Sequence, residues 1–351
     1  MGLSQVAGAR VRRLVLGAVA LAVATLTPNV ATAQSGGRAR VMIVTGVAGD
    51  PQFADLFFKQ ATTMIDALEK RFGIPASDVV YLAEDPSRDA ARIKGPSTKE
   101  NIERELVAIA SRSKAGDVLF VMLIGHGSGD GTTTRFNVPG PDITAADFAR
   151  VLEPVKGATI AIVNAASASG GFIAALSGPN RVIVTATKSD MERNQTRFAT
   201  YFVQAYASDV ADADKDGRVS VLEAFEYARR EVARAYESEN HLLTEHAQLD
   251  DNGDHKGTSA PDAKSDEGTL ARRVFLGGTA SSVTAVARAA STDPRVATLE
   301  REKDALESRI DSLRRRKASM DSTAYEKALE DLLVQLAEKN KAIRDAAGGR
   351  P

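Results

Sequence analysis

The sequence contains no cysteine and no tryptophan among its 351 residues. Without cysteine the chain forms no disulfide bonds, carries no thiol nucleophile and has no attachment point for a lipoprotein lipid. Aromatic residues make up only 5% of the chain, so Val, Leu, Ile and Ala must build the core. The 45 Lys and Arg nearly cancel the 46 Asp and Glu. This balance gives no reason to expect nucleic acid or an anionic membrane as a partner.

Residues 1–33 have the three-part pattern of a secretory signal peptide. Arg12 and Arg13 precede an uncharged apolar stretch at 14–26, and Ala31-Thr32-Ala33 supplies a small-x-small cleavage site. The stretch is shorter than the roughly 20 apolar residues that a membrane-spanning helix needs. A retained N-terminal anchor is the alternative. We expect an exported protein, either periplasmic or secreted, with no membrane attachment after the signal is removed.

Residues 38–280 alternate short apolar runs with segments of helical spacing. The runs at 118–124 and 159–163 are bounded by polar, glycine-containing turns, as buried parallel strands are. Further strands are expected at 41–44, 79–82, 181–185 and 273–276. Strands that alternate with helices in this way predict an α/β fold, a three-layer sandwich with a mostly parallel central sheet.

The apolar runs at 118–124 and 159–163 are each followed by polar residues that are candidates for catalysis. His126 and Gly127 follow the first run, and Ser167 lies in the small-residue segment after the second. Parallel sheets build their sites where strands end, so we expect His126 and Ser167 to face each other. This layout resembles the caspase/legumain-like superfamily of cysteine peptidases, in which one strand ends in His-Gly and a later one in Asp-x-Cys-x-Ser-Gly. Alignment on Ser169-Gly170-Gly171 puts Ser167 at the position of the family's cysteine, and Ala165 at that of its aspartate.

The resemblance implies that His126 is a general base and that the Gly127 and Ser167 N–H groups form an oxyanion hole. A cysteine near a histidine is appreciably thiolate at neutral pH, whereas a serine hydroxyl must lose its proton in the transition state. Serine triads meet this demand with a carboxylate that orients the base. No such acid is evident here, because Asp130 and Asp142 lie near His126 only in sequence.

Three hypotheses follow for the function. The first is a non-catalytic pseudopeptidase, an exported scaffold or interaction protein. The second is a serine-dependent hydrolase of peptides or proteins that uses Ser167 and His126. The third makes the C-terminal segment the functional part and the α/β domain a passive scaffold.

Residues 212–223 fit the twelve-residue EF-hand loop, which predicts calcium as a cofactor. Calcium prefers six to eight oxygen ligands, and carboxylates at positions 1, 3 and 5 supply three of them. Gly217 permits the sharp turn at position 6. The expected ligands are Asp212, Asp214, Asp216, the Arg218 backbone carbonyl, Ser220 directly or through water, and Glu223. The alternative is an acidic surface turn without an ion.

A second acidic loop contains half of such a site. Asp250, Asn252 and Asp254 take positions 1, 3 and 5, but His255 stands where the loop needs glycine and no glutamate lies at position 12. Binding of a second ion and an empty loop both remain open.

Residues 294–347 have a different pattern from the rest of the chain. Leu299, Leu306 and Leu313 are seven residues apart, and a second apolar seam runs from Tyr325 to Ile343. Two such seams joined by a polar break predict an antiparallel coiled-coil hairpin after a linker at 281–293. We expect the hairpin to mediate self-association or docking to a protein.

Overall fold

The computed structural model describes residues 37–214, 216–262, 266–277 and 321–346, together with nine residues between 295 and 313. The signal peptide expected at 1–33 and the linker expected at 281–293 lie outside the described residues. Within the described part of the chain, no helix is both long enough and apolar enough to cross a membrane.

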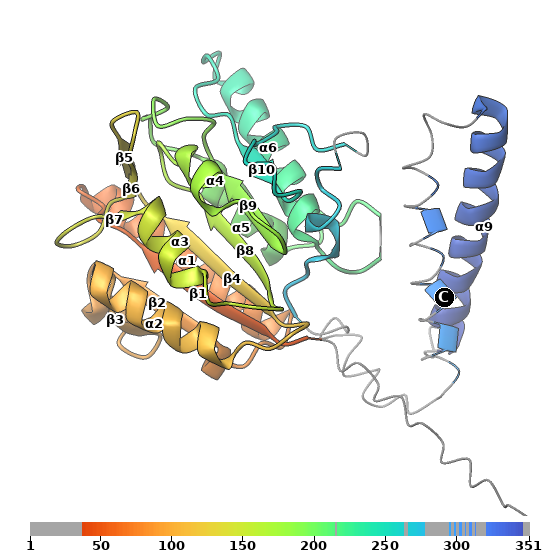
Figure 1. Ribbon diagram of the computed structural model, residues 1–351, viewed down its shortest axis with the longest axis horizontal. Coiled ribbons are helices and arrows are strands. Elements are labelled where there is room, and N and C mark those ends of the chain that lie inside the picture. Colours follow the sequence, from red (N-terminus) through yellow and green to blue (C-terminus); the bar gives the residue numbers. More distant parts are fainter. Residues whose placement is uncertain are drawn as a thin grey trace, which may run out of the picture. The chain divides into compact units, whose positions relative to one another are not determined.

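The central sheet has seven strands in the order β10-β9-β8-β4-β1-β2-β3 (Figure 1). All neighbouring strands are parallel except β10, which is antiparallel to β9. The sheet strands are β1 (Ala39–Thr45), β2 (Val79–Ala83), β3 (Ile93–Pro96), β4 (Val118–Ile124), β8 (Thr159–Asn164), β9 (Arg181–Thr185) and β10 (Gln248–Asp250). A small antiparallel sheet comprises β5 (Gly127–Gly129), β6 (Thr134–Phe136) and β7 (Ile143–Thr144).

Helices cover both faces of the central sheet, which confirms the predicted three-layer α/β sandwich. Alternate residues of β4 face the two apolar clusters: Phe120 and Met122 belong to one, and Leu119 and Val121 to the other. One cluster includes residues of α1 (Pro51–Lys70), α5 (Phe198–Ala207) and α6 (Val221–Ser238). The other includes residues of α2 (Lys99–Arg112), α3 (Ala145–Leu152) and α4 (Gly171–Leu176). Three short 3-10 helices, η1 (Ala76–Asp78), η2 (Pro86–Asp89) and η3 (Ala271–Arg273), lie in the connections.

The register of β4 and β8 brings their carboxyl ends to one edge of the sheet. The two strands pair in parallel from Val118 opposite Thr159 to Leu123 opposite Asn164. Helix α1 follows β1. It begins at Pro51, because the Asp50 side chain accepts the Gln52 N–H and proline is favoured in the first helical turn. The turns after β4 and β8 are therefore neighbours, as the sequence predicted.

The prediction of a strand at 273–276 is wrong. Residues 271–273 form η3, and Phe275 makes only an isolated antiparallel bridge with Ser220. Beside this bridge, the Val221 N–H at the start of α6 donates to the Val274 carbonyl at 2.9 Å. Val274 and Leu276 are apolar because they are buried in the cluster that includes α6. The actual edge strand is β10, whose sequence Gln-Leu-Asp contains a single apolar residue and gives no strand pattern.

The C-terminal segment contains helix α9 (Ser322–Ala346). Described residues on either side of the polar break share an apolar cluster, in which Leu306, Ile310 and Leu313 join Tyr325 and Leu332. Glu302 and Lys339 form an ion pair at 2.6 Å. These contacts agree with an antiparallel hairpin, and the coiled-coil hairpin stays a prediction.

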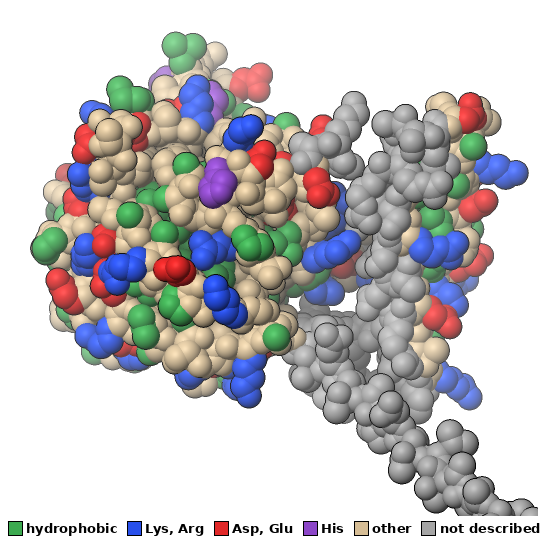
Figure 2. Space-filling view, in the orientation of Figure 1, with side chains coloured by type: hydrophobic (Ala, Val, Ile, Leu, Met, Phe, Trp, Pro, Cys, Tyr) green, Lys and Arg blue, Asp and Glu red, His purple; other side chains and the backbone are tan. Residues whose placement is uncertain are grey.

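On the face shown in Figure 2, acidic and basic side chains are interspersed with scattered hydrophobic ones. No charge of one sign dominates this face, in keeping with the balanced composition.

Candidate active site and calcium loop

His126 lies in the turn after β4 and is half-buried. Its Nε2 lies 3.2 Å from the carbonyl oxygen of Ala48, in the turn after β1. The rings of Phe53 and Phe57 from α1 contact the imidazole edge-on. Burial lowers the pKa of His126 from its ordinary value, so the neutral imidazole is favoured. With Nε2–H donated to Ala48, Nδ1 carries the free lone pair.

Ser167 lies in the turn after β8 and is only 2% exposed. The Gly127 N–H donates to Ser167 Oγ at 3.2 Å, and Oγ lies 3.4 Å from the Gly127 carbonyl oxygen. A Cβ at position 127 would lie 2.3 Å from the Ser167 carbonyl oxygen, so only glycine allows this approach. The structure therefore brings the turn that carries His126 and the turn that carries Ser167 together.

The side chains of Ser167 and His126 have different hydrogen-bond partners. Among the hydrogen bonds of residues 37–214, none joins Ser167 to His126. The serine hydroxyl interacts with Gly127 and the imidazole with Ala48. The Gly127 N–H, which the family resemblance assigned to an oxyanion hole, is directed at Ser167 Oγ instead.

Neither acid near His126 in sequence orients its ring. The Asp130 carboxylate accepts hydrogen bonds from Thr132 and pairs with Arg135, which holds the pKa of Asp130 far below its usual value. Asp142 accepts the Val138 N–H at 3.1 Å. The group that fixes His126 is a backbone carbonyl, which no side-chain motif reveals.

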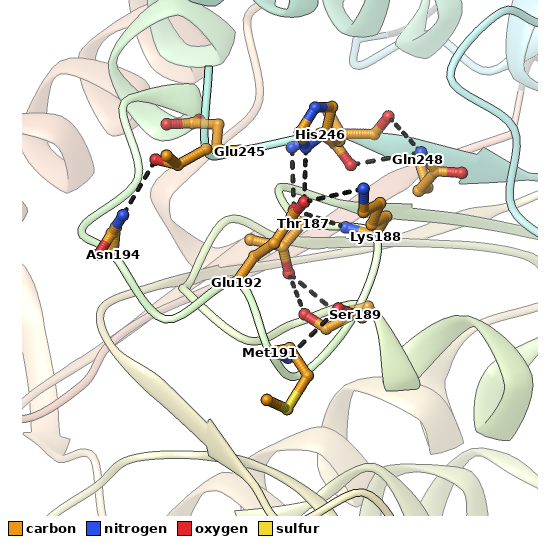
Figure 3. Close-up of polar contacts among 12 residues, drawn as sticks. Thr187, Lys188, Ser189, Met191, Glu192, Asn194, Glu245, His246 and Gln248 are labelled. Atoms are coloured by element: carbon orange, nitrogen blue, oxygen red, sulfur yellow. Dashed lines mark hydrogen bonds and ion pairs between the residues drawn. The ribbon is translucent and has the colours of Figure 1, made fainter. Parts of the chain in front are cut away.

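A loop after β9 holds the Ser167 turn from the other side. Ala168 has a φ of 52°, a left-handed conformation that is uncommon outside glycine, and its N–H donates to the Glu192 carbonyl at 2.7 Å. The Glu192 side chain contacts His246 Nδ1 at 2.5 Å and accepts the His246 and Lys188 N–H groups (Figure 3). The sequence gives no sign of this anchor, because Glu192 and His246 are 54 residues apart and share no motif.

The loop at 212–223 brings its first three predicted ligands together. One carboxylate oxygen each of Asp212, Asp214 and Asp216 lies within 4.8 Å of the others. Asp212 is 7% exposed, and its Oδ1 is buried without a hydrogen-bond partner. Burial and the charge of Asp214 raise the pKa of Asp216 to about 6. Crowded carboxylates of this kind are stabilised by a divalent cation, so these residues fit calcium.

The remaining predicted ligands lie around the same loop. Gly217 has a φ of 82°, as a sharp turn at position 6 requires. Glu223 Oε1 accepts the Ala213 N–H at 2.9 Å and thereby closes the loop onto α6. Ser220 and Glu223 form the capping box of α6, so the Ser220 hydroxyl already serves as a helix cap. The Arg218 side chain lies over the Phe275 ring, which leaves only its backbone for an ion.

Two carboxylates of the second acidic loop lie close to a third that the loop motif does not contain. Asp250, Asp254 and Glu267 each place one carboxylate oxygen within 4.8 Å of the others. Asn252 Oδ1 accepts the Asp254 N–H at 2.8 Å, as Asp214 accepts the Asp216 N–H in the first loop. Glu267 comes from a separate segment and was missed, since it lies outside the loop motif.

Residues 89–250 match the model of the Peptidase C13 family. The α/β domain has a caspase/legumain-like fold. Solved structures that match the chain include a protein from Geobacter sulfurreducens, with 10% identity, a TM-score of 0.40, and coverage of 61% of this chain and 92% of that one. The Drosophila initiator caspase Dronc is 11% identical, with a TM-score of 0.38 and coverage of 64% and 83%. No curated protein matches the sequence.

Within this caspase/legumain-like domain, the match includes the turns that carry His126 and Ser167 as well as the loop at 212–223. Strands β1 and β2 and helix α1 precede the matched residues. The turn after β1 supplies Ala48, and α1 supplies the two phenylalanines around His126.

Proposed function

We propose that this protein is an exported, non-catalytic homologue of caspase/legumain-like peptidases that is stabilised by calcium and acts as a scaffold or interaction protein. One observation carries the proposal. The hydroxyl of Ser167 is buried and bonded to the Gly127 backbone, with no hydrogen bond to His126 among the described residues.

Catalysis by Ser167 would require several changes at once. The hydroxyl would have to leave Gly127 and turn to His126, and the Gly127 N–H would have to become free for an oxyanion. Each such donor contributes about 3 kcal/mol of transition-state stabilisation in serine peptidases. A serine also lacks the low pKa that makes a cysteine a nucleophile beside a histidine. These demands favour a retained fold with lost chemistry.

A serine-dependent hydrolase is the second candidate, and the Ala48 carbonyl favours it. This carbonyl fixes Nε2–H of His126 and so leaves Nδ1 as a potential base. A carbonyl dipole nevertheless stabilises an imidazolium less than the carboxylate of a serine triad does. In this alternative, binding of a substrate would have to turn the Ser167 hydroxyl toward Nδ1.

Interaction through the C-terminal segment is the third candidate. The apolar cluster that contains Leu306, Ile310, Tyr325 and Leu332 supports this candidate. A hairpin that satisfies its own seam leaves its outer faces for self-association or for docking to a partner. In this view the α/β domain is a folded platform.

Cleavage of an unbiased peptide library tests the proposal. The mature protein is incubated with the library in calcium, and new termini are identified by mass spectrometry beside a Ser167→Ala sample. We expect the same peptides from both samples. New termini that are present with the wild type and absent with Ser167→Ala would overturn the pseudopeptidase proposal in favour of the hydrolase.

A further inference from the structure

Three carboxylates converge where the loop after β10 meets the segment 266–274. One oxygen each of Asp250, Asp254 and Glu267 lies within 4.8 Å of the others. Asp250 is 1% exposed and Glu267 is 5% exposed. Buried carboxylates in such proximity repel one another unless a proton or a cation lies between them.

The Asp250 carboxylate has an oxygen with no partner. Its Oδ1 accepts the Gly253 N–H at 3.1 Å, whereas its Oδ2 is buried and accepts no hydrogen bond from the described residues. Asp212 shows the same arrangement in the first loop, with one oxygen bonded to Gly217 and the other buried and unpaired. A buried anionic oxygen without a donor is costly, and a bound cation removes that cost.

The two loops also share their turns. In the first loop, Asp214 accepts the N–H of Asp216 and Asp216 accepts that of Arg218. In the second, Asn252 accepts the N–H of Asp254 and Asp254 accepts that of Lys256. His255, which stands at the glycine position, has a φ of 65°, the left-handed conformation that Gly217 adopts in the first loop. The histidine therefore does not prevent the sharp turn.

We propose that Asp250, Asp254 and Glu267 bind a second calcium ion. Pro261 stands at position 12 of the second loop, and Glu267 supplies from a later segment the carboxylate that Glu223 supplies in the first. The site offers carboxylate oxygens, which suits calcium rather than the softer metals that select nitrogen and sulfur. This site is separate from the loop at 212–223 on which the proposed function relies.

A calcium ion at this site would stabilise the segment 266–274, which contacts the residues next to the first loop. Asp251 accepts the N–H groups of Gly268 and Ala271 at 2.7 Å each, and its own N–H donates to Glu267. The same segment continues to Val274, whose carbonyl accepts the Val221 N–H at the start of α6. An ion held by Glu267 thus stabilises the strand-like contact beside the first loop.

Calcium stoichiometry tests the inference. The full mature chain is freed of metal and dialysed to equilibrium against radioactive calcium with an excess of magnesium. Variants Asp250→Asn and Glu267→Gln keep the size of each side chain, and Glu223→Gln disables the first loop. Asp266→Asn is the matched control, because this exposed neighbour of Glu267 lies outside the cluster. Circular dichroism in chelator confirms that each variant is folded.

We expect two ions on the wild type and on Asp266→Asn. Asp250→Asn or Glu267→Gln should each lose one ion, or bind it at least about tenfold more weakly, as should Glu223→Gln. A single ion that is lost only in Glu223→Gln would overturn the second site and leave the proposed function intact. A single ion that is lost only in Glu267→Gln would support the second site and contradict the calcium loop of the proposed function. Unchanged binding in a folded Glu267→Gln protein would also overturn the inference.

Discussion

The Gly127 N–H donates to the hydroxyl oxygen of Ser167 at 3.2 Å, so the turn after β4 is joined to the turn after β8. This contact places Ser167 beside the turn that carries His126, and it occupies the hydroxyl oxygen of Ser167 with a hydrogen bond. Among the described residues, no hydrogen bond joins this hydroxyl to His126, the group that would have to activate the serine.

Exchange of Ser167 for cysteine should restore part of the missing chemistry. The chain has no other cysteine, so Ser167→Cys introduces a single thiol beside His126. Ordinary thiols have a pKa near 8.5, and pairing with a histidine lowers it by up to several units. We expect the pH profile of alkylation by iodoacetamide to have its midpoint at least about one unit below that of the double variant Ser167→Cys/His126→Ala.

Ser238→Cys, at an exposed position of α6, provides a free-thiol reference. If Ser167→Cys titrates like this reference and does not respond to His126→Ala, the two positions form no catalytic pair.

Calcium should stabilise the folded protein. A ligand that binds only the native state adds about 2.7 kcal/mol at a hundredfold excess over its dissociation constant. The double variant Asp212→Asn/Glu223→Gln should lose the part of this increment that belongs to the first loop. The measurement is the difference in melting temperature between calcium and chelator for each protein, which cancels the loss of the Glu223 capping interaction.

Glu237→Gln is the matched control for this experiment, since Glu237 is exposed on the same helix as Glu223. A wild-type melting curve that is the same in calcium and chelator would contradict stabilisation by the ion.

Several features of this molecule could be predicted from sequence and others could not. Strands β4 and β8 are buried on both faces and therefore largely apolar, so the sequence pattern predicts them. The Asp-x-Asp-x-Asp-Gly spacing at 212–217 is local and was equally clear. Ala48 orients His126 through a backbone carbonyl, which leaves no trace in a side-chain pattern. Glu267 reaches Asp250 only through the tertiary fold, so no loop motif contains it.

Glu245 should make stability depend on pH. Burial raises the pKa of Glu245 to about 7, although its carboxylate accepts the N–H groups of Arg197 and Phe198. The native state then holds the proton more tightly than the unfolded state, whose carboxyl has a pKa near 4.5. Stability from this group is complete below about pH 4.5 and is lost as the pH rises through about 7.

The glutamine of Glu245→Gln does not titrate. As the pH rises from about 4.5 to about 7, the free energy of unfolding of this variant should therefore increase by roughly 3 kcal/mol relative to that of the wild type. Denaturant midpoints at a series of pH values measure the difference, with Glu237→Gln as an exposed control. Parallel profiles for the wild type and Glu245→Gln would show that the carboxyl is not perturbed.

Removal of residues 294–351 should leave the α/β domain folded and change its oligomeric state or hydrodynamic size. The seam residues Leu306 and Leu332 bury within the C-terminal segment itself. Analytical ultracentrifugation of the full mature chain and the truncated chain measures the change. Insoluble truncated protein would mean that the segment completes the core of the domain.

Reactivity toward a fluorophosphonate probe tests the central claim most directly, because it needs only an activated serine and no known substrate. The mature protein in calcium is treated with the probe beside Ser167→Ala, His126→Ala and an active serine peptidase as a positive control. The account predicts no labelling of Ser167 in the wild type, since its hydroxyl is bound to Gly127 and lacks an activating base. Labelling of the wild type that disappears in both Ser167→Ala and His126→Ala would contradict it.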